Sequence, residues 1–168
     1  MDTGTIVRWL EGIPFFEDFK REELESLASD QSHFYKYSEN DRVIQEGERD
    51  TALYILLKGS VRVSKQTSDK DLNLAVLKEG SIFGEMTLLR KGKRTSSVTA
   101  DQTCIIMVLK PYTLQNLEGR LLAKIKDQLL KIVLRRFERL EGKYTDLVNQ
   151  NTIEEDVNDE WDLKKPQS

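Results

Sequence analysis

Residues Gly80 to Val98 read GSIFGEMTLLRKGKRTSSV, and this stretch decides how the chain is interpreted. It leaves one predicted strand, turns at Gly84, has room for a short helical turn at 85–89, and enters another strand after Arg94. Glycine at position 84 lets the backbone approach a ligand closely. The first amides of a short helix have no partners within the helix and suit an anion. Arg94 adds a planar, permanently charged group for phosphate oxygens. The stretch therefore predicts a phosphate site.

Glu85 lies inside this predicted anion site and calls for a different partner. A carboxylate repels an anion, so we expect Glu85 to accept hydrogen bonds from neutral hydroxyl groups. A 3′,5′-cyclic nucleotide meets both needs, because its ring holds the phosphate next to the ribose and leaves the 2′-hydroxyl free. An exposed ion pair between Glu85 and Arg94 would contribute only about 0–1 kcal/mol, so we assign ligand roles to both residues.

The rest of the chain indicates a mainly β protein with flanking helices. Between Phe34 and Leu109, short β-rich runs alternate with turn residues such as Glu46-Gly47-Glu48. This spacing is typical of a small antiparallel barrel or roll. Before this β-rich region, apolar residues recur at helical spacing. After it, a long helix is predicted from about Leu121 to Val148. We divide the chain into an N-terminal helical segment (1–32), a β-roll (33–112), C-terminal helices (113–150) and an acidic disordered tail (151–168).

The stretch around Gly84 resembles the phosphate-binding cassette of the cyclic nucleotide-binding domain family. That family includes bacterial catabolite activators, regulatory subunits of cyclic-AMP-dependent kinase and cyclic-nucleotide-gated channels. The resemblance covers roughly residues 13–110 and implies an antiparallel, jelly-roll-like β-roll (a double-stranded β-helix). Asn40 stands where many members have glycine, and asparagine tolerates a positive φ. The matching segments are Phe83–Leu89, Arg94–Val98, Ile13–Phe16, Glu22–Leu24, Val43–Glu48 and Leu53–Val63.

The resemblance also implies roles for single residues. Glu85 would accept from the ribose 2′-hydroxyl, and Arg94 would pair with the cyclic phosphate. Thr95 matches a position at which some cGMP-responsive members contact guanine, but cAMP binders also have hydroxyl residues there, and we favour cAMP over cGMP. Arg135 resembles, by spacing only, a lid arginine of channel-type domains. The complete expected ligand-binding set is Val63 and Leu74 at the base, Phe83, Gly84, Glu85, Met86, Thr87, Arg94, Thr95 and Ser96 around the sugar and phosphate, and Arg135.

The long C-terminal helix has two interpretations that the sequence leaves open. Its apolar residues recur at steps of three and four, which are typical of a coiled-coil seam and equally of a helix lying on a core. In the first interpretation the helix closes over the base as a lid and the chain is a ligand sensor. In the second, it joins two chains into a homodimeric adaptor that keeps the fold without responding to nucleotide. The row is Leu129, Val133, Phe137, Leu140, Tyr144 and Leu147.

Composition excludes several other classes of function. One cysteine and one histidine cannot form an internal disulfide or the usual structural zinc site. Glu85 has no second placed acid or nucleophile beside it, so we expect no enzyme and no catalytic cofactor. The net charge of −3 and the lack of a helix-turn-helix argue against DNA binding. No apolar run is long enough to span a bilayer or serve as a secretion signal, which predicts a cytoplasmic protein with an unknown effector partner.

Overall fold

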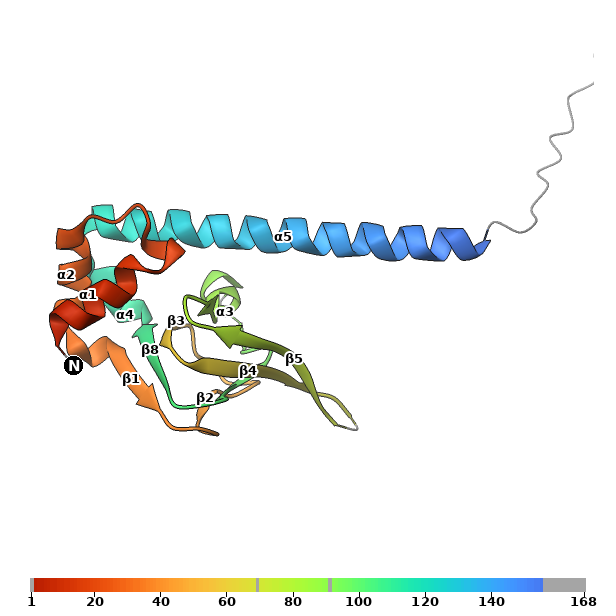
Figure 1. Cartoon of the computed structure of the whole chain (residues 1–168), viewed down its shortest axis with the longest axis horizontal. Helices are drawn as coiled ribbons and strands as arrows, with labels where there is room; N and C mark the ends of the chain where they lie inside the picture. The colour runs from red at the N-terminus through yellow and green to blue at the C-terminus, as the bar shows by residue number, and fades with distance from the viewer. Residues whose placement is uncertain (1, 69, 91, 156–168) are drawn as a thin grey trace, which may run out of the picture. The chain divides into compact units, whose positions relative to one another are not determined.

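A computed structural model describes residues 2–68, 70–90 and 92–155. Within these ranges, eight strands form two four-stranded antiparallel sheets (Figure 1). One sheet has the order β1-β8-β3-β6 and the other has the order β2-β7-β4-β5. The predicted antiparallel β-roll is confirmed. The strands are β1 (Phe34–Tyr37), β2 (Arg42–Ile44), β3 (Leu53–Lys58), β4 (Ser60–Gln66), β5 (Asp71–Lys78), β6 (Ile82–Phe83), β7 (Ser97–Ala100) and β8 (Cys104–Leu109).

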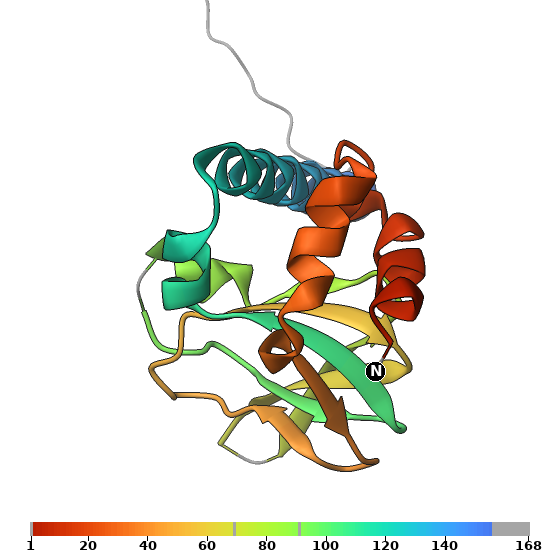
Figure 2. The same ribbon diagram turned by 90° about the vertical axis from the view of Figure 1, so that its left-hand side faces the viewer.

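Helices precede and follow the roll. Asp2 caps the first of them by accepting a 3.0 Å hydrogen bond from the amide of Thr5. α1 and α2 lie together on one side of the two sheets (Figure 2), and Phe15, Phe16 and Phe19 form an aromatic cluster beside them. The helical elements are α1 (Thr3–Glu11), η1 (Pro14–Phe16), α2 (Arg21–Ser29), η2 (Gln31–His33), α3 (Glu85–Arg90), α4 (Pro111–Asn116) and α5 (Gly119–Glu155).

The core of the roll lies between the two sheets. Side chains of alternate strand residues meet there, including Tyr54 and Leu56 from β3, Val61 from β4 and Ile106 from β8. The residues of β3 that point the other way are buried as well, so this strand is apolar on both faces. A continuous apolar run such as 53–57 is therefore compatible with a strand. Asn40 adopts a φ of 68°, as a glycine would at this turn.

The chain divides into two units, residues 1–128 and 129–168, and each is described by itself. α5 begins in the first unit, where Lys124 Nζ donates to Glu23 Oε2 at 2.6 Å and to the carbonyl of Asp18 at 2.8 Å. Gln128 Nε2 donates to Asp18 Oδ2 at 2.7 Å, so the start of α5 is held against the N-terminal helices. Among the described residues, no helix combines the length and apolar character that a membrane crossing requires.

α5 is longer than the sequence predicted. It starts at Gly119 rather than Leu121, continues through Gly142 and ends at Glu155. A single glycine costs a helix only about 1 kcal/mol, which a long helix tolerates. The helix thus enters the segment that was assigned to the acidic tail, whose residues 156–168 lie outside the described part of the chain.

Candidate functional site

Gly84 is the point where the chain turns from β6 into α3. Its φ of +81° belongs to the left-handed region, which favours glycine. A Cβ atom here would lie 2.7 Å from Arg94 Nη1, 2.9 Å from Tyr54 Cδ2 and 3.0 Å from the carbonyl oxygen of Ala52. Glycine at this position therefore leaves the space through which the arginine side chain passes. Glu85 follows as the first residue of α3 and is 1% exposed.

Arg94 is the buried cation of the site, with 3% of its surface exposed. Its Nη1 donates to the carbonyl of Gly84 at 2.8 Å and to Thr87 Oγ1 at 3.3 Å. Its Nη2 donates to Asp50 Oδ2 at 2.5 Å and to the carbonyl of Ala52 at 2.8 Å. These acceptors offset the cost of burying the charge. Its Nε is buried and finds no acceptor in the part of the chain that the structure describes. One donor of the guanidinium is therefore available to a ligand.

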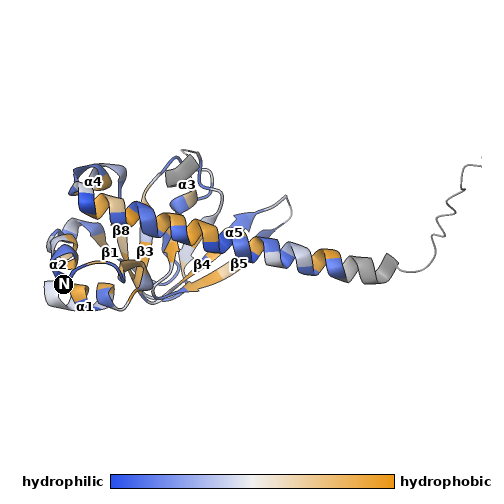
Figure 3. Cartoon of the chain, turned by 90° about the horizontal axis from the view of Figure 1, so that it is seen from above, coloured by the Kyte–Doolittle hydropathy of each residue, from blue (hydrophilic) through white to orange (hydrophobic). Residues whose placement is uncertain are grey.

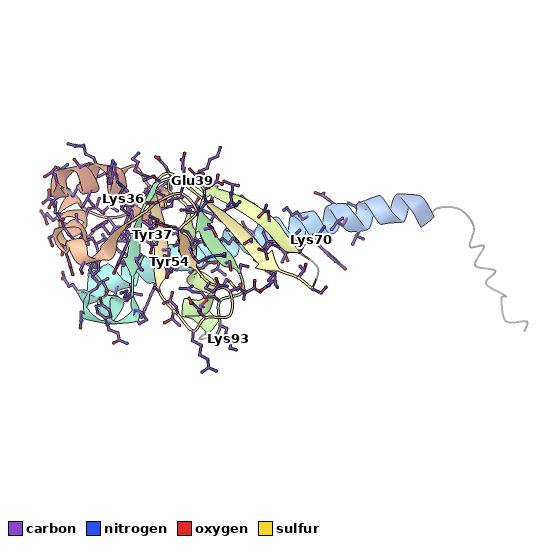
Figure 4. The ribbon with its side chains drawn as sticks, turned by 90° about the horizontal axis from the view of Figure 1, so that it is seen from below. Lys36, Tyr37, Glu39, Tyr54, Lys70 and Lys93 are labelled. Atoms are coloured by element: carbon purple, nitrogen blue, oxygen red, sulfur yellow. The ribbon has the colours of Figure 1, made fainter. Side chains whose placement is uncertain are left out.

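Asp50 and Tyr54 hold the guanidinium from the side of the core. Asp50 Oδ2 accepts a second hydrogen bond, at 2.7 Å, from the hydroxyl of Tyr54. The ring of Tyr54 lies 5.2 Å from Arg94 Cζ and stacks on Phe83 with 5.3 Å between the ring centroids. A cation facing an aromatic ring at this distance is attracted to it. Figure 4 shows Tyr54 inside the roll. Arginine, carboxylate and phenol thus form one connected group.

The hydrogen bonds of this group fix its charges. Burial alone raises the pKa of Asp50, but the hydrogen bonds from Arg94, Tyr54 and the amide of Ala52 lower it more, and the pKa lies below the ordinary value. Burial and the hydrogen bond to Asp50 raise the pKa of Tyr54. The phenol therefore remains a neutral donor, and Asp50 remains a carboxylate at neutral pH.

This charge arrangement predicts how stability depends on pH. Because the folded-state pKa of Asp50 is lowered, its stabilising effect is complete above the unfolded value of about 3.9 and is lost as the pH falls through the folded value. Asp50→Asn should lower the free energy of unfolding at pH 7 by about 1–2 kcal/mol, reduced by its partial exposure. The difference between wild type and variant should narrow below about pH 4. Urea unfolding at pH 7, 5 and 3.5 measures it.

A matched control is Asp101→Asn. Asp101 is exposed to a similar extent as Asp50 and accepts from Arg62 at 2.6 Å, but Arg62 is 37% exposed whereas Arg94 is buried, and a typical ion pair of exposed groups contributes less than about 1 kcal/mol. If the difference in the free energy of unfolding between wild type and Asp50→Asn stays constant from pH 7 to pH 3.5, the role assigned to the carboxylate of Asp50 is wrong.

The loop between β2 and β3 brings Asp50 to Arg94. The amide of Gly47 donates to the carbonyl of Arg94 at 2.9 Å, and the amide of Arg94 donates to the carbonyl of Glu48 at 2.8 Å. The amide of Glu46 adds a 3.0 Å hydrogen bond to Ser97 Oγ. Sequence analysis identified this loop only as a turn and missed Asp50. The sequence contains one signal for Asp50, which is its position as a carboxylate shortly after the Glu46-Gly47-Glu48 turn. Pairing Asp50 with Arg94 requires knowledge of the sheet topology.

The predicted sugar and phosphate residues gather at one place. Thr87 is buried against Arg94, Met86 is 42% exposed, Thr95 is exposed and Ser96 is half-buried. A pocket of about 130 Å³ opens here, and Figure 4 shows Lys93 at the outer edge of the molecule. Pockets for whole drug-sized ligands measure about 300–1,000 Å³, so this one matches a part of a nucleotide. Its lining residues are Met86, Thr87, Gly92, Lys93 and Thr95.

The residues predicted for the base lie on the β4–β5 hairpin. Val63 packs against the core between the sheets and is opposite Ala75. The register then shifts, so Leu74 is an extra residue in β5, and it is 49% exposed. At such a bulge, neighbouring side chains turn toward the same face. Arg135 is an exposed residue of α5 in the second unit, so its contact with a base stays a prediction.

Comparison with known proteins identifies the family. Residues 34–118, half of the chain, match the family model of the cyclic nucleotide-binding domain. The chain belongs to the cyclic nucleotide-binding domain family. This confirms the resemblance found in the sequence around Gly84.

Relatives of this family member are regulatory proteins. The cyclic AMP receptor protein of Thermus thermophilus is 26% identical over 148 residues, which are 80% of this chain and 67% of that protein. The cAMP-dependent protein kinase regulatory subunit of Mycosarcoma maydis is 30% identical over 93 residues, 55% of this chain and 18% of that one. The crystal structure of the Thermus thermophilus catabolite activator protein matches with a TM-score of 0.68 and 26% identity, covering 80% of this chain and 63% of that chain. The chain thus spans from less than a fifth to about two thirds of these proteins.

Proposed function

We propose that this chain is a regulatory domain that binds 3′,5′-cAMP, in preference to 3′,5′-cGMP, at Arg94 and Glu85. The observation that carries the proposal is the buried Nε of Arg94, a charged donor for which the described residues supply no acceptor, next to a pocket that Lys93 and Thr95 line. A cyclic phosphate supplies the oxygen that this donor lacks. A buried donor that gains an acceptor, in a hydrogen bond between charged groups, contributes about 1.5–3 kcal/mol.

The remaining site residues hold the sugar and the base. The carboxylate of Glu85 accepts from the ribose 2′-hydroxyl, and the backbone of Gly84, Met86 and Thr87 surrounds the sugar-phosphate ring. The hydroxyl or amide groups of Thr95 and Ser96 donate to the phosphate, and the apolar side chains of Val63 and Leu74 contact the base. The names of both relatives refer to cAMP, which supports this nucleotide. We assign no catalytic step to any of these residues.

Asp50 gives the site a means of transmitting ligand binding. In the structure this carboxylate occupies Nη2 of Arg94 and lies in the loop between β2 and β3. A cyclic phosphate competes with Asp50 for the same guanidinium. Binding of the phosphate therefore changes the hydrogen bond that holds this loop to Arg94, as well as the contacts of α3. A ligand shifts a conformation only by its different affinity for the two states, and the exchange of partners at Arg94 provides such a difference.

The part of α5 beyond Gln128 is assigned two roles. In the sensor, Leu129, Ile132 or Val133 covers the apolar face of the base, with Arg135 reaching it. In the alternative, a dimeric adaptor, the same helix joins two chains. The exposed apolar side chains of α5 support this second role.

Thermal unfolding with added nucleotides tests the proposed function. A ligand at 100 times its dissociation constant adds about 2.7 kcal/mol of stability, which for a chain of this length raises Tm by about 5–10 °C. We expect this shift with cAMP, a smaller one with cGMP at the same concentration, and none with 5′-AMP, which lacks the phosphate ring. No shift with any cyclic nucleotide at millimolar concentration would refute the proposal.

A further inference from the structure

A second cavity, of about 260 Å³, opens between the start of α5 and the segment that joins η1 to α2. It lies in the first unit of the chain, and none of its described lining residues belongs to the nucleotide site. α5 contributes two pairs of residues that are four positions apart, which places them on one face of the helix. Figure 3 shows hydrophilic residues alternating with hydrophobic ones along this helix. The lining residues are Asp18, Ala123, Lys124, Asp127 and Gln128.

The cavity has an exposed mouth and a buried floor. Asp18, Ala123 and Asp127 are exposed, whereas Gln128 is only 4% exposed. The amide nitrogen of Gln128 donates to Asp18 Oδ2 at 2.7 Å, but its amide oxygen accepts no hydrogen bond from the residues that the structure describes. Unlike Arg94 Nε, this oxygen is not sealed from solvent, so it is open to the cavity. A polar atom on a buried side chain requires a partner. The floor therefore presents a hydrogen-bond acceptor to a guest.

The charges around the cavity favour a positively charged guest. Lys124 is the cation of the described lining, and its Nζ donates to Glu23 Oε2 at 2.6 Å and to the carbonyl of Asp18 at 2.8 Å. Glu23 thus balances the charge of Lys124, and the carboxylates of Asp18 and Asp127 make the mouth negative. An ionised carboxylate offers about four acceptor positions, so the contacts that these two residues make within the chain still allow each to accept from a guest.

A guanidinium group meets these requirements. It is a permanent cation with five N–H donors and no acceptor, and it pairs with carboxylates through two parallel hydrogen bonds. The cavity is smaller than the roughly 300–1,000 Å³ of pockets for drug-sized ligands, and this size suits a single side chain. The carboxylates lie at the exposed mouth, where a side chain of another protein reaches them, and arginine is enriched where proteins bind each other. We propose that this cavity receives an arginine side chain of a partner protein.

Titration of the full chain with N-acetylarginine amide, followed by NMR, tests the recognition of the guanidinium. We expect saturable shifts of the backbone amides of residues 123–128, with a dissociation constant of about 1–10 mM. N-acetylcitrulline amide has the same shape without the charge and should give no saturable shift. The α-acetylated amide of lysine carries a point charge and should bind at least about 3-fold more weakly. Equal binding of the lysine or citrulline compound, or no saturable shift with the arginine compound up to about 50 mM, would overturn the proposal.

Three variants test whether the guanidinium occupies this cavity. Ala123→Leu fills the mouth and keeps every charge, so it should weaken binding at least about 10-fold. Because Ala123 is exposed and leucine is a good helix former, this variant keeps its fold, which circular dichroism verifies. Asp127→Asn removes one carboxylate and should weaken binding at least about 5-fold. The control Asp146→Asn removes the same charge from an exposed position of the same helix and should change the affinity less than about 2-fold. Binding that Ala123→Leu and Asp127→Asn leave unchanged would place the guanidinium elsewhere.

Free L-arginine distinguishes a partner protein from a small-molecule ligand. Its own ammonium and carboxylate groups add affinity only if the cavity is built for the free amino acid. A docking site for a protein should bind free arginine no more than about 3-fold more tightly than the capped amide. Free arginine that binds more than about 10-fold more tightly would show that the cavity takes a free amino acid, and the docking proposal would be wrong. None of these measurements requires a cyclic nucleotide, so their outcome is independent of the proposed function.

Discussion

Arg94→Ala is expected to weaken cAMP binding by at least about 100-fold. The guanidinium is the buried cation at the proposed phosphate position, and each hydrogen bond between charged groups contributes about 1.5–3 kcal/mol. Two such bonds, one from Nε and one from Nη2 once the phosphate replaces Asp50, amount to about 3–6 kcal/mol, which is two to four powers of ten in affinity. Arg94→Lys keeps the positive charge but loses the planar donor arrangement, so we expect an intermediate affinity. Isothermal titration calorimetry of the three proteins measures these differences.

The control for charge removal is Arg42→Ala. Arg42 is exposed on β2, so its loss should leave the affinity within about 2-fold. Because Arg94 is buried, its replacement also removes partners of Asp50 and Ala52, and urea unfolding must show that the variant is folded at the titration temperature. A folded Arg94→Ala protein that binds cAMP as tightly as wild type would show that the phosphate lies elsewhere.

The local parts of this site could be predicted from the sequence. Gly84, Glu85 and Arg94 lie within eleven consecutive residues, so their chemistry could be combined without knowing the fold. The extent of the strand region, from Phe34 to Leu109, was also predicted, because apolar residues alternate or run continuously between turn residues there. β6 was not predicted, because a strand of two residues has no periodicity.

The partners that reach Arg94 from elsewhere could not be predicted. Asp50 precedes Arg94 by 44 positions, and Tyr54 precedes it by 40. The continuous apolar run of β3 predicts a buried strand, but not which residue Tyr54 meets inside the roll. That meeting depends on the backbone pairing of Gly47 and Glu48 with Arg94, a non-local contact. For the same reason, the hydrogen bonds of Lys124 to Asp18 and Glu23 appear only in the folded chain.

Gly84→Ala is expected to damage both stability and binding. The new Cβ would stand 2.7 Å from Arg94 Nη1, 2.9 Å from the ring of Tyr54 and 3.0 Å from the carbonyl of Ala52. The ring of Tyr54 and the backbone of Ala52 cannot move away from the new Cβ. In addition, the backbone of residue 84 has a φ of +81°, which costs an alanine about 1–2 kcal/mol by itself. We expect a total loss of about 3–5 kcal/mol in the free energy of unfolding, measured in urea. In the fraction that folds, Arg94 must move away, so cAMP affinity should fall by more than about 100-fold.

Alanine variants of two other glycines distinguish the cost of the backbone conformation and of crowding from the displacement of Arg94. Gly47 has a φ of +85° and nothing within 4 Å of a Cβ, so Gly47→Ala should lose only the backbone cost of about 1–2 kcal/mol and retain binding. Gly59 has a φ of +91° and equal crowding, with the carbonyl of Thr103 at 2.6 Å, but its neighbours are Thr103 and Cys104 rather than Arg94. Gly59→Ala should therefore be as unstable as Gly84→Ala while its folded fraction binds cAMP normally. If Gly84→Ala loses no more affinity than Gly59→Ala, the close approach of Arg94 to residue 84 is not part of the binding site.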